Sequence, residues 1–171
     1  MGMGGIGRWL LRAALGGVAP LLIGGTGLTT NLDHRILAAH NRERAALGVP
    51  QLRWNPALAA SARSWADYLG RTGAFRHDLQ EDEGENLWAG TRGHYSAEAM
   101  VGAWVEEKKH FRPGAFPHNS STGEVGDVGH YTQVAWRRTH EVGCALAKST
   151  QEDVLVCRYA QAGNIIGERP F

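Results

Sequence analysis

The chain has 171 residues, a length that suits one domain with a single core, and its 43% hydrophobic residues exclude a disordered polymer. Its 18 Lys and Arg residues nearly balance 17 Asp and Glu residues, which leaves a formal net charge of +1. This balance gives no electrostatic reason to expect nucleic-acid binding, so no nucleic-acid partner is predicted.

Residues 1–30 differ in composition from the rest of the chain and contain no acidic residue. Arg8 and Arg12 precede the apolar stretch 13–23, and small residues follow at 24–27, which is the order of zones in a secretory signal. The apolar stretch is about half as long as a membrane-spanning helix requires. We therefore predict export to the periplasm or the exterior. A retained segment that tethers the protein is the alternative, and membrane contact is expected only through this segment.

An amphipathic helix is predicted at residues 33–47, with Asn31 or Asp33 as its N-cap and Gly48 after its end. His40 lies beside the apolar stripe of this helix, one turn after a buried position. A hydrogen-bonded histidine at the edge of the core is favoured there over a ligand.

A second helix is predicted to begin at Asn55-Pro56, where asparagine caps and proline occupies the first helical position. It ends at Gly70 or Gly73, and its apolar residues recur at steps of three and four, which predicts one buried face. This helix is assigned to packing.

An acidic loop follows, and Glu85 differs from the other acids in it. It follows Gly84, and it is separated by Asn86 alone from the apolar pair Leu87 and Trp88, which should be buried. A carboxylate drawn toward a core needs a partner, and His77 is a candidate if the loop between them folds back.

A third helix is predicted at residues 96–111, with Ser96 as its cap. Glu107 lies on its apolar stripe, three residues after Trp104 and four before Phe111, whereas Glu106 is rotated toward solvent. A carboxylate there needs an imidazolium, a metal or a hydrogen-bond donor unless it only borders the stripe and reaches water.

Residues 129–136 are predicted to form a short helix after a long loop rich in Pro, Gly and Ser, and His130 would lie at the beginning of this helix. The helix continues with the bulky apolar residues Val134 and Trp136. A histidine at this position can ligate a metal, exchange a proton or pack.

The last third of the chain predicts a hairpin with strands at 141–148 and 153–159. The only two cysteines, Cys144 and Cys157, lie one in each strand, and they stand nearly opposite each other if the strands pair about Thr150. Export favours a disulfide between them over two buried thiols.

Four residues from separate segments stand out on these grounds: His77, Glu85, Glu107 and His130. Two imidazoles and two carboxylates suit a zinc site in which histidine nitrogens bind the metal and glutamates orient water or the second ring nitrogens. The chain has no His-Glu-x-x-His motif, so spacing alone is a weak signal.

The stretch Gly129-His130-Tyr131-Thr132-Gln133-Val134-Ala135-Trp136, followed by Thr139, resembles the signature of the CAP superfamily. This superfamily groups cysteine-rich secretory proteins, venom allergens and plant pathogenesis-related proteins. Other segments resemble family landmarks in the same order, namely His40-Asn41, Gly84-Glu85-Asn86-Leu87, Trp104 with Glu107, Gly143-Cys144, Cys157-Arg158-Tyr159 and Gly163-Asn164.

The resemblance covers residues 33–171 and implies an α+β fold, a three-layer α-β-α sandwich with a small antiparallel sheet over residues 31–171. It also implies that His77, Glu85, Glu107 and His130 line one central cleft. His77 and His130 are then the expected ligands of zinc or another divalent metal, and no organic cofactor is expected.

Function is less constrained, because one scaffold carries several activities. The favoured hypothesis is an exported, non-catalytic protein that binds a lipid, a sterol or another small apolar ligand. The alternatives are a metal-dependent hydrolase or peptidase, in which Glu85 or Glu107 activates a zinc-bound water, and a module that recognises a protein partner. An enzyme is not favoured, because only two nitrogen ligands and no evident nucleophile or oxyanion site are present.

Overall fold

The computed structural model describes residues 31–78 and 82–171. The predicted export segment, residues 1–30, lies outside the described residues. The α-helices are α1 (Leu32–Ala46), α2 (Pro56–Thr72), α3 (Ala97–Val105) and α4 (Gly129–Ala135), and the 3-10 helices are η1 (Glu106–His110) and η2 (Val125–Asp127). The strands are β1 (Arg53–Trp54), β2 (Gly84–Thr91), β3 (Glu141–Lys148) and β4 (Glu152–Ala160).

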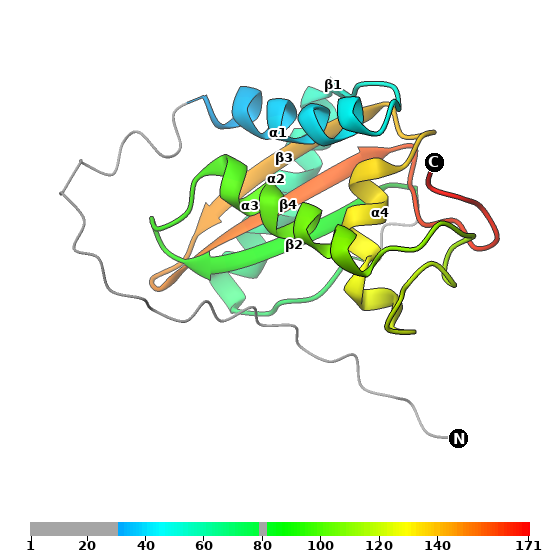
Figure 1. Cartoon of the computed structure of the whole chain (residues 1–171). Coiled ribbons are helices and arrows are strands. Elements are labelled where there is room, and N and C mark those ends of the chain that lie inside the picture. Colours follow the sequence, from blue (N-terminus) through cyan, green and yellow to red (C-terminus); the bar gives the residue numbers. More distant parts are fainter. Residues whose placement is uncertain (1–30, 79–81) are drawn as a thin grey trace, which may run out of the picture.

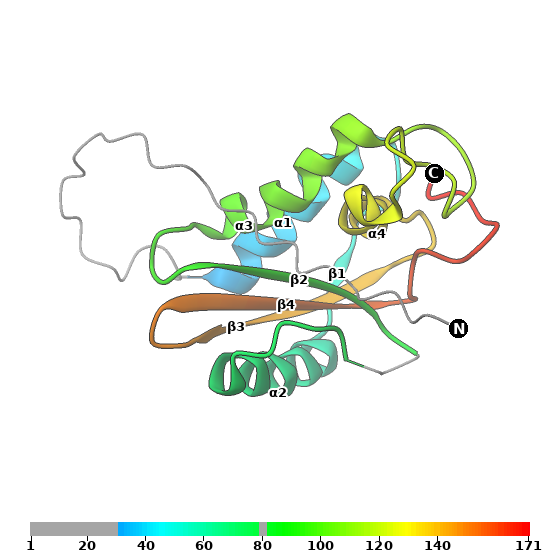
Figure 2. The ribbon, with the colours of Figure 1, turned by 90° about the horizontal axis from the view of Figure 1, so that it is seen from below.

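The described elements form three layers around one sheet of order β1-β3-β4-β2 (Figure 1). The long strands β3, β4 and β2 pair antiparallel, and the two-residue β1 is added in parallel to β3. Helix α2 covers one face, while α1, α3 and α4 cover the other (Figure 2). The predicted α-β-α sandwich is confirmed. No helix of the described ranges is long and apolar enough to cross a membrane.

The ends of α2 form as their residue types predict. Asn55 accepts hydrogen bonds from the backbone N–H groups of Ala57 and Leu58, and Gly73 ends the helix at a φ of 68°. Helix α1 follows Asn31, whose side chain makes no capping hydrogen bond. The position of this N-cap was predicted, but the predicted side-chain cap is absent.

The third predicted helix divides into two. Ser96 caps α3 through the N–H of Ala99, as expected, but the α-helix ends at Val105 and the chain continues as η1. Glu106 is exposed and Glu107 is partly buried, so the predicted difference between the two carboxylates is confirmed.

Each face of the sheet carries its own apolar cluster. Aromatic and branched side chains of α1, α3 and α4 pack on one face, and small residues of α2 pack on the other. The approach of α2 is close, because a Cβ at Gly143 of β3 would meet the backbone of Asn55, Leu58 and Ala59.

The predicted hairpin is confirmed, and its register places Cys144 directly opposite Cys157. The two cysteines form a disulfide, as predicted. This bond joins the two central strands on the side of the sheet that faces α1, α3 and α4.

Candidate functional site

Glu107 of η1 and His130 of α4 form one pair at the beginning of α4. The Nδ1–H of His130 donates to Oε1 of Glu107 at 2.6 Å, and Oε2 accepts the backbone N–H groups of His130 at 2.9 Å and Tyr131 at 3.0 Å. The first N–H groups of a helix have no partner within it, so Glu107 both caps α4 and orients the imidazole. The prediction that Glu107 needs a partner is confirmed.

The His130 ring is held on two further sides. The ring stacks on the indole of Trp104, with centroids 6.2 Å apart and planes at 16°. The backbone carbonyl of His130 accepts a hydrogen bond from the side chain of Asn86 at 3.1 Å. The His130 side chain is 29% exposed. Because Nδ1 is used by Glu107, Nε2 is the ring nitrogen left for a ligand.

His77 and Glu85 form the second pair. Oε1 of Glu85 accepts the Nδ1–H of His77 at 2.7 Å and the backbone N–H of Asp78 at 3.2 Å. The His77 side chain is 60% exposed and that of Glu85 only 6%. His77 and Glu85 are therefore partners, as expected, and Nε2 is the ring nitrogen of His77 left for a ligand.

Arg158 of β4 supports this second pair from inside the molecule, and sequence reasoning had not selected it. Its side chain is 1% exposed, and Nη2 donates to Oδ2 of Asp78 at 2.7 Å. The same nitrogen lies 3.1 Å from Oε2 of Glu85, an ion pair whose geometry leaves Oε2 without a hydrogen bond. A cation buried under Glu85 offsets the cost of burying that carboxylate.

A buried chain of hydrogen bonds connects α1 to His130. The Nδ1–H of His40 donates to the carbonyl of Ile36 at 2.9 Å, so Nε2 accepts the hydroxyl of Tyr159 at 2.8 Å. That hydroxyl accepts from Asn86 at 3.3 Å, which also donates to His130. Burial lowers the pKa of His40 to about 4 and raises the pKa of Tyr159. His40 is thus the hydrogen-bonded core histidine that was predicted.

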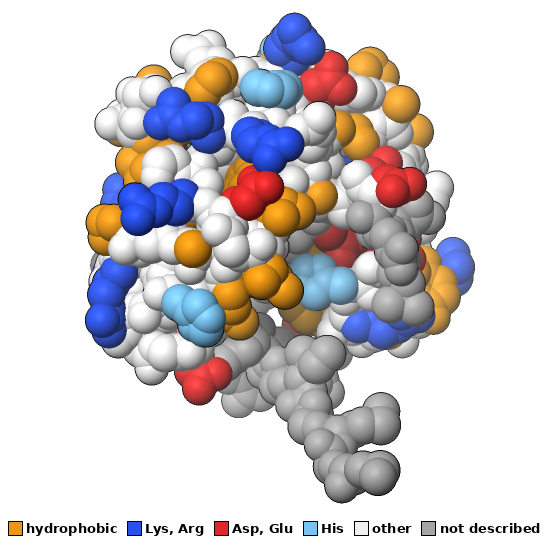
Figure 3. Space-filling model, turned by 90° about the vertical axis from the view of Figure 1, so that its right-hand side faces the viewer, with side chains coloured by type: hydrophobic (Ala, Val, Ile, Leu, Met, Phe, Trp, Pro, Cys, Tyr) orange, Lys and Arg blue, Asp and Glu red, His pale blue; other side chains and the backbone are white. Residues whose placement is uncertain are grey.

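The edge strand β2 lies between the two pairs. Successive strand residues point to opposite faces, so Glu85 lies on the face of α2 with Leu87, and Asn86 lies on the face of α4. At this end of the molecule a histidine side chain lies against acidic and hydrophobic side chains at the surface (Figure 3). The structure groups the four predicted residues as two pairs, and their meeting in one cleft stays a prediction.

Both glutamates are already engaged as hydrogen-bond acceptors. Glu107 holds three N–H donors, and Glu85 holds two beside Arg158. Within the described ranges, no three His, Cys, Asp or Glu side chains are grouped as a metal site.

Residues 37–159 match the Cysteine-rich secretory protein family, which covers most of the described fold. The chain belongs to this CAP family. Pathogenesis-related protein 1B of Nicotiana tabacum is 36% identical to it, with 88% of each chain covered. Pathogenesis-related protein 1 of Arabidopsis thaliana is 35% identical, with 79% of this chain and 80% of the relative covered.

Solved structures show the same fold at lower identity. A crystal structure of NaASP2 with Zn²⁺ superposes with a TM-score of 0.72 and 20% identity, over 85% of this CAP chain and 87% of that one. Venom allergen-like protein 4 of Schistosoma mansoni superposes with a TM-score of 0.56 and 23% identity, over 88% and 95%. These likenesses support the sandwich architecture of the CAP domain.

Proposed function

We propose that this CAP protein is exported, binds a small apolar ligand without turning it over, and holds a divalent metal between His77 and His130. The observation that carries the metal proposal is that the two imidazoles make the same kind of hydrogen bond. Each donates Nδ1–H to a glutamate, which leaves Nε2 of each ring for a ligand.

The two imidazole nitrogens would supply two of the four ligands that zinc usually takes, and water or a ligand oxygen would supply the others. Bound zinc supplies a Lewis acid to such an oxygen. Glu85 and Glu107 then act as positioning residues, because they fix the tautomer and the direction of each ring. NaASP2, which shares the fold, was solved with Zn²⁺.

A pocket between α1 and α3 supports the apolar ligand. It has a volume of about 100 Å³ and is lined by Ala39, Val101, Gly102 and Val105, with Arg42, Glu43 and Glu98 also bordering it. Pockets that enclose whole drug-sized molecules are roughly 300–1,000 Å³, so this one fits the end of an alkyl chain better than a rigid sterol. The charged residues would remain beside a polar head group.

Calorimetric titration with Zn²⁺ tests the metal site. We expect one site in the wild type and a loss of at least about tenfold in affinity in both His77→Ala and His130→Ala. His94→Ala is the matched control, because His94 is exposed on another loop. Unchanged affinity in the double variant His77→Ala, His130→Ala would remove these residues from the proposal.

Binding of a spin-labelled fatty acid to wild type and Gly102→Leu tests the apolar pocket. Gly102 lines the pocket and a Cβ there meets no atom within 4 Å, so the leucine side chain begins in open space and should occupy part of the pocket. We expect folding to be retained and binding to fall. Equal binding by both proteins would place the ligand elsewhere.

A zinc-dependent turnover assay against peptide and ester libraries tests the non-catalytic part. Turnover that disappears in Glu107→Gln would replace the binding proposal with the hydrolase. Mass spectrometry of the mature protein tests export, since a cleaved chain lacks residues 1–30 or most of them.

A further inference from the structure

A turn near the C-terminus carries the two most exposed large hydrophobic side chains of the described ranges. Ile166 is 81% exposed and Ile165 is 43% exposed. The N–H of Glu168 donates to the carbonyl of Ile165 at 3.1 Å, and Gly167 has a φ of 84°. A type II turn requires a glycine at that position, so Ile166 lies at the corner of the turn. The two isoleucines therefore contribute little to the core and remain in contact with water.

Neighbouring segments hold this turn in place. The N–H of Gly167 donates to the carbonyl of Phe116, and the N–H of Phe116 donates to the carbonyl of Glu168, both at 2.8 Å. The side chain of Asn164, just before the turn, donates to the carbonyl of Gly129 at 2.9 Å. A turn that is already ordered loses little further conformational entropy when it binds a partner.

The segments that meet at this turn are basic. They are residues 111–121, 137–140 and 161–171, which hydrogen bonds join to one another. Together they contain four arginines, with Glu168 as their one acidic residue, and Glu168 is already paired with Arg138 at 3.0 Å. Lys and Arg side chains lie beside hydrophobic ones at this end of the molecule (Figure 3). The two isoleucines therefore stand in positively charged surroundings.

The third exposed large hydrophobic side chain of the described residues has the opposite surroundings. Val125 of η2 is 39% exposed, and it follows Glu124 and precedes Asp127 by two positions. It provides a comparison within the same protein, because it is apolar and exposed but lies beside acidic residues.

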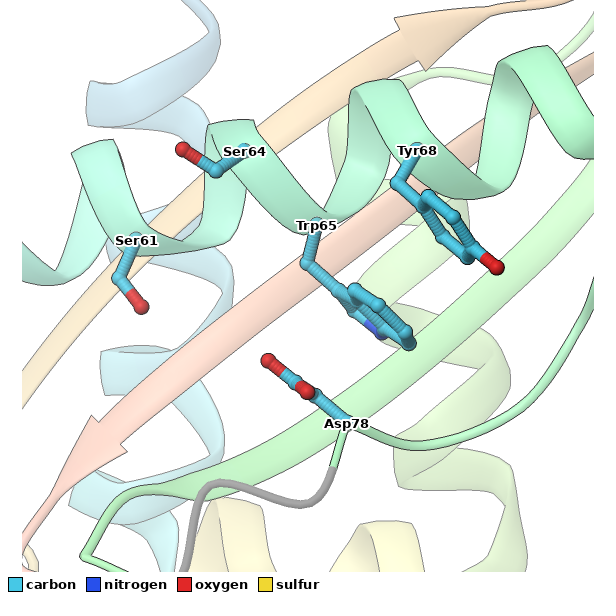
Figure 4. A pocket seen from close by; sticks show the side chains of 5 residues that line it. All are labelled: Ser61, Ser64, Trp65, Tyr68 and Asp78. Atoms are coloured by element: carbon cyan, nitrogen blue, oxygen red, sulfur yellow. The ribbon is translucent and has the colours of Figure 1, made fainter.

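A pocket of about 320 Å³ on the α2 face offers no comparable surface. It is lined by Ser61, Ser64, Trp65, Tyr68 and Asp78 (Figure 4). Trp65 and Tyr68 stack on each other beneath Arg76, and Nε1 of Trp65 is buried. The exposed turn is therefore the feature that calls for a partner.

We propose that the turn at Ile165 and Ile166 inserts into the headgroup region of an anionic phospholipid bilayer. Apolar side chains gain free energy on leaving water, and each arginine close to an anionic lipid surface adds an attraction that salt screens. The exposed apolar surface is confined to a narrow tip, whereas a stable protein interface buries roughly 800 Å² on each partner. This contact is additional to the one expected through residues 1–30.

A fluorophore attached at the turn tests this contact in the full-length protein. The two native cysteines form a disulfide, so Ile166→Cys supplies one free thiol for an environment-sensitive NBD label. We expect NBD emission to rise and shift to shorter wavelength with vesicles of equal parts phosphatidylcholine and phosphatidylserine. Pure phosphatidylcholine vesicles should change it little. Salt at about 1 M should remove the response, since the Debye length falls to about 3 Å.

Two further labelled proteins separate insertion of the turn from other attachment. The same label on Val125→Cys should remain in water, even if residues 1–30 hold the protein at the vesicle. Adding Ile165→Ser to the protein labelled at residue 166 should raise the vesicle concentration for a half-maximal response about threefold, because less apolar surface leaves water. Val125→Ser is the matched control and should leave that concentration unchanged.

Three results would overturn the proposal. The first is unchanged NBD emission at residue 166 with anionic vesicles. The second is an equal response to pure phosphatidylcholine, which would remove the role of the arginines. The third is an equal response at residue 125, which would show attachment without this orientation. His77→Ala and Gly102→Leu should leave the response at residue 166 unchanged, so failure of the metal or apolar-ligand proposal is distinguishable from failure of this one.

Discussion

The surroundings of His40 favour the neutral form of its imidazole. Its two ring nitrogens are used by the carbonyl of Ile36 and the hydroxyl of Tyr159, and the residue is 0% exposed. A second ring proton would face the Tyr159 hydroxyl, whose own proton already occupies that hydrogen bond. Burial therefore lowers the pKa of His40 from 6.5 to about 4.

This shift predicts acid sensitivity with a defined direction. Between pH 6.5 and pH 4 the unfolded chain binds the proton on His40 and the folded chain does not, so stability falls as the pH falls through this window. The loss between pH 7 and pH 5 should be about 2 kcal/mol. Urea unfolding at the two pH values measures it. His40→Gln, which cannot gain this proton, should show a flatter dependence; an equal slope would contradict the assignment.

Glu107→Gln tests whether the carboxylate acts through His130. If the amide oxygen takes the place of Oε2 and accepts the backbone N–H groups, the amide NH2 stands opposite Nδ1 and cannot accept its proton, so the tautomer with Nδ1–H is no longer favoured. We expect zinc affinity to fall by roughly 10-fold to 100-fold while the fold is retained. The matched control is Glu106→Gln, the exposed neighbour, which should bind zinc as wild type does. Equal affinity in all three proteins would show that Glu107 only caps α4.

At the scale of elements, α4 is positioned at both ends by buried groups from other segments. Glu107 holds its first N–H groups, and Arg44 of α1 donates to the carbonyls of Val134, Trp136 and Thr139 at its other end. Arg44 is 0% exposed, so these bonds replace the water it has lost. A short helix that would not be stable alone is thereby fixed, and His130 with it.

Two glycine-to-alanine substitutions should change the free energy of unfolding in opposite directions, because Gly143 packs against the backbone of α2 whereas Gly102 faces open space. Gly143→Ala would place its Cβ against the rigid backbone of α2, so we expect a loss of about 1–3 kcal/mol or more. Gly102→Ala has open space on α3 and should gain roughly 0.5–1 kcal/mol. Urea midpoints compare the two, and a Gly143→Ala protein as stable as wild type would show that α2 can shift.

Local chemistry explains which elements sequence reasoning located. The ends of α2 were predictable because they depend on local residues: the Asn55 side chain caps the first N–H groups, and Gly73 adopts the positive φ that ends the helix. Strand β2 was not predicted, because its glycine- and alanine-containing segment becomes a strand by pairing with β4. The change from α3 to η1 after Val105 was also missed.

For the whole molecule, the candidate site was predictable where a single residue broke a pattern. Glu107 lies on an apolar stripe and Glu85 lies beside two apolar residues, so the sequence predicts that each carboxylate has a hydrogen-bonding or charged partner. Arg158 gave a similar signal, a cation inside a buried strand run, but its partners Asp78 and Glu85 lie about 70–80 positions earlier in the chain. Which distant charges meet is set by the packing of the sheet, and periodicity does not report it.

The central claim is that two separately anchored histidines serve one metal ion. The most direct measurement is ¹⁵N NMR of the imidazole nitrogens during titration with Zn²⁺. We predict that the resonances of Nε2 of His77 and Nε2 of His130 shift together and reach completion at one equivalent of Zn²⁺, while both Nδ1 atoms stay protonated. A response of only one ring, or two steps at different metal ratios, would contradict it.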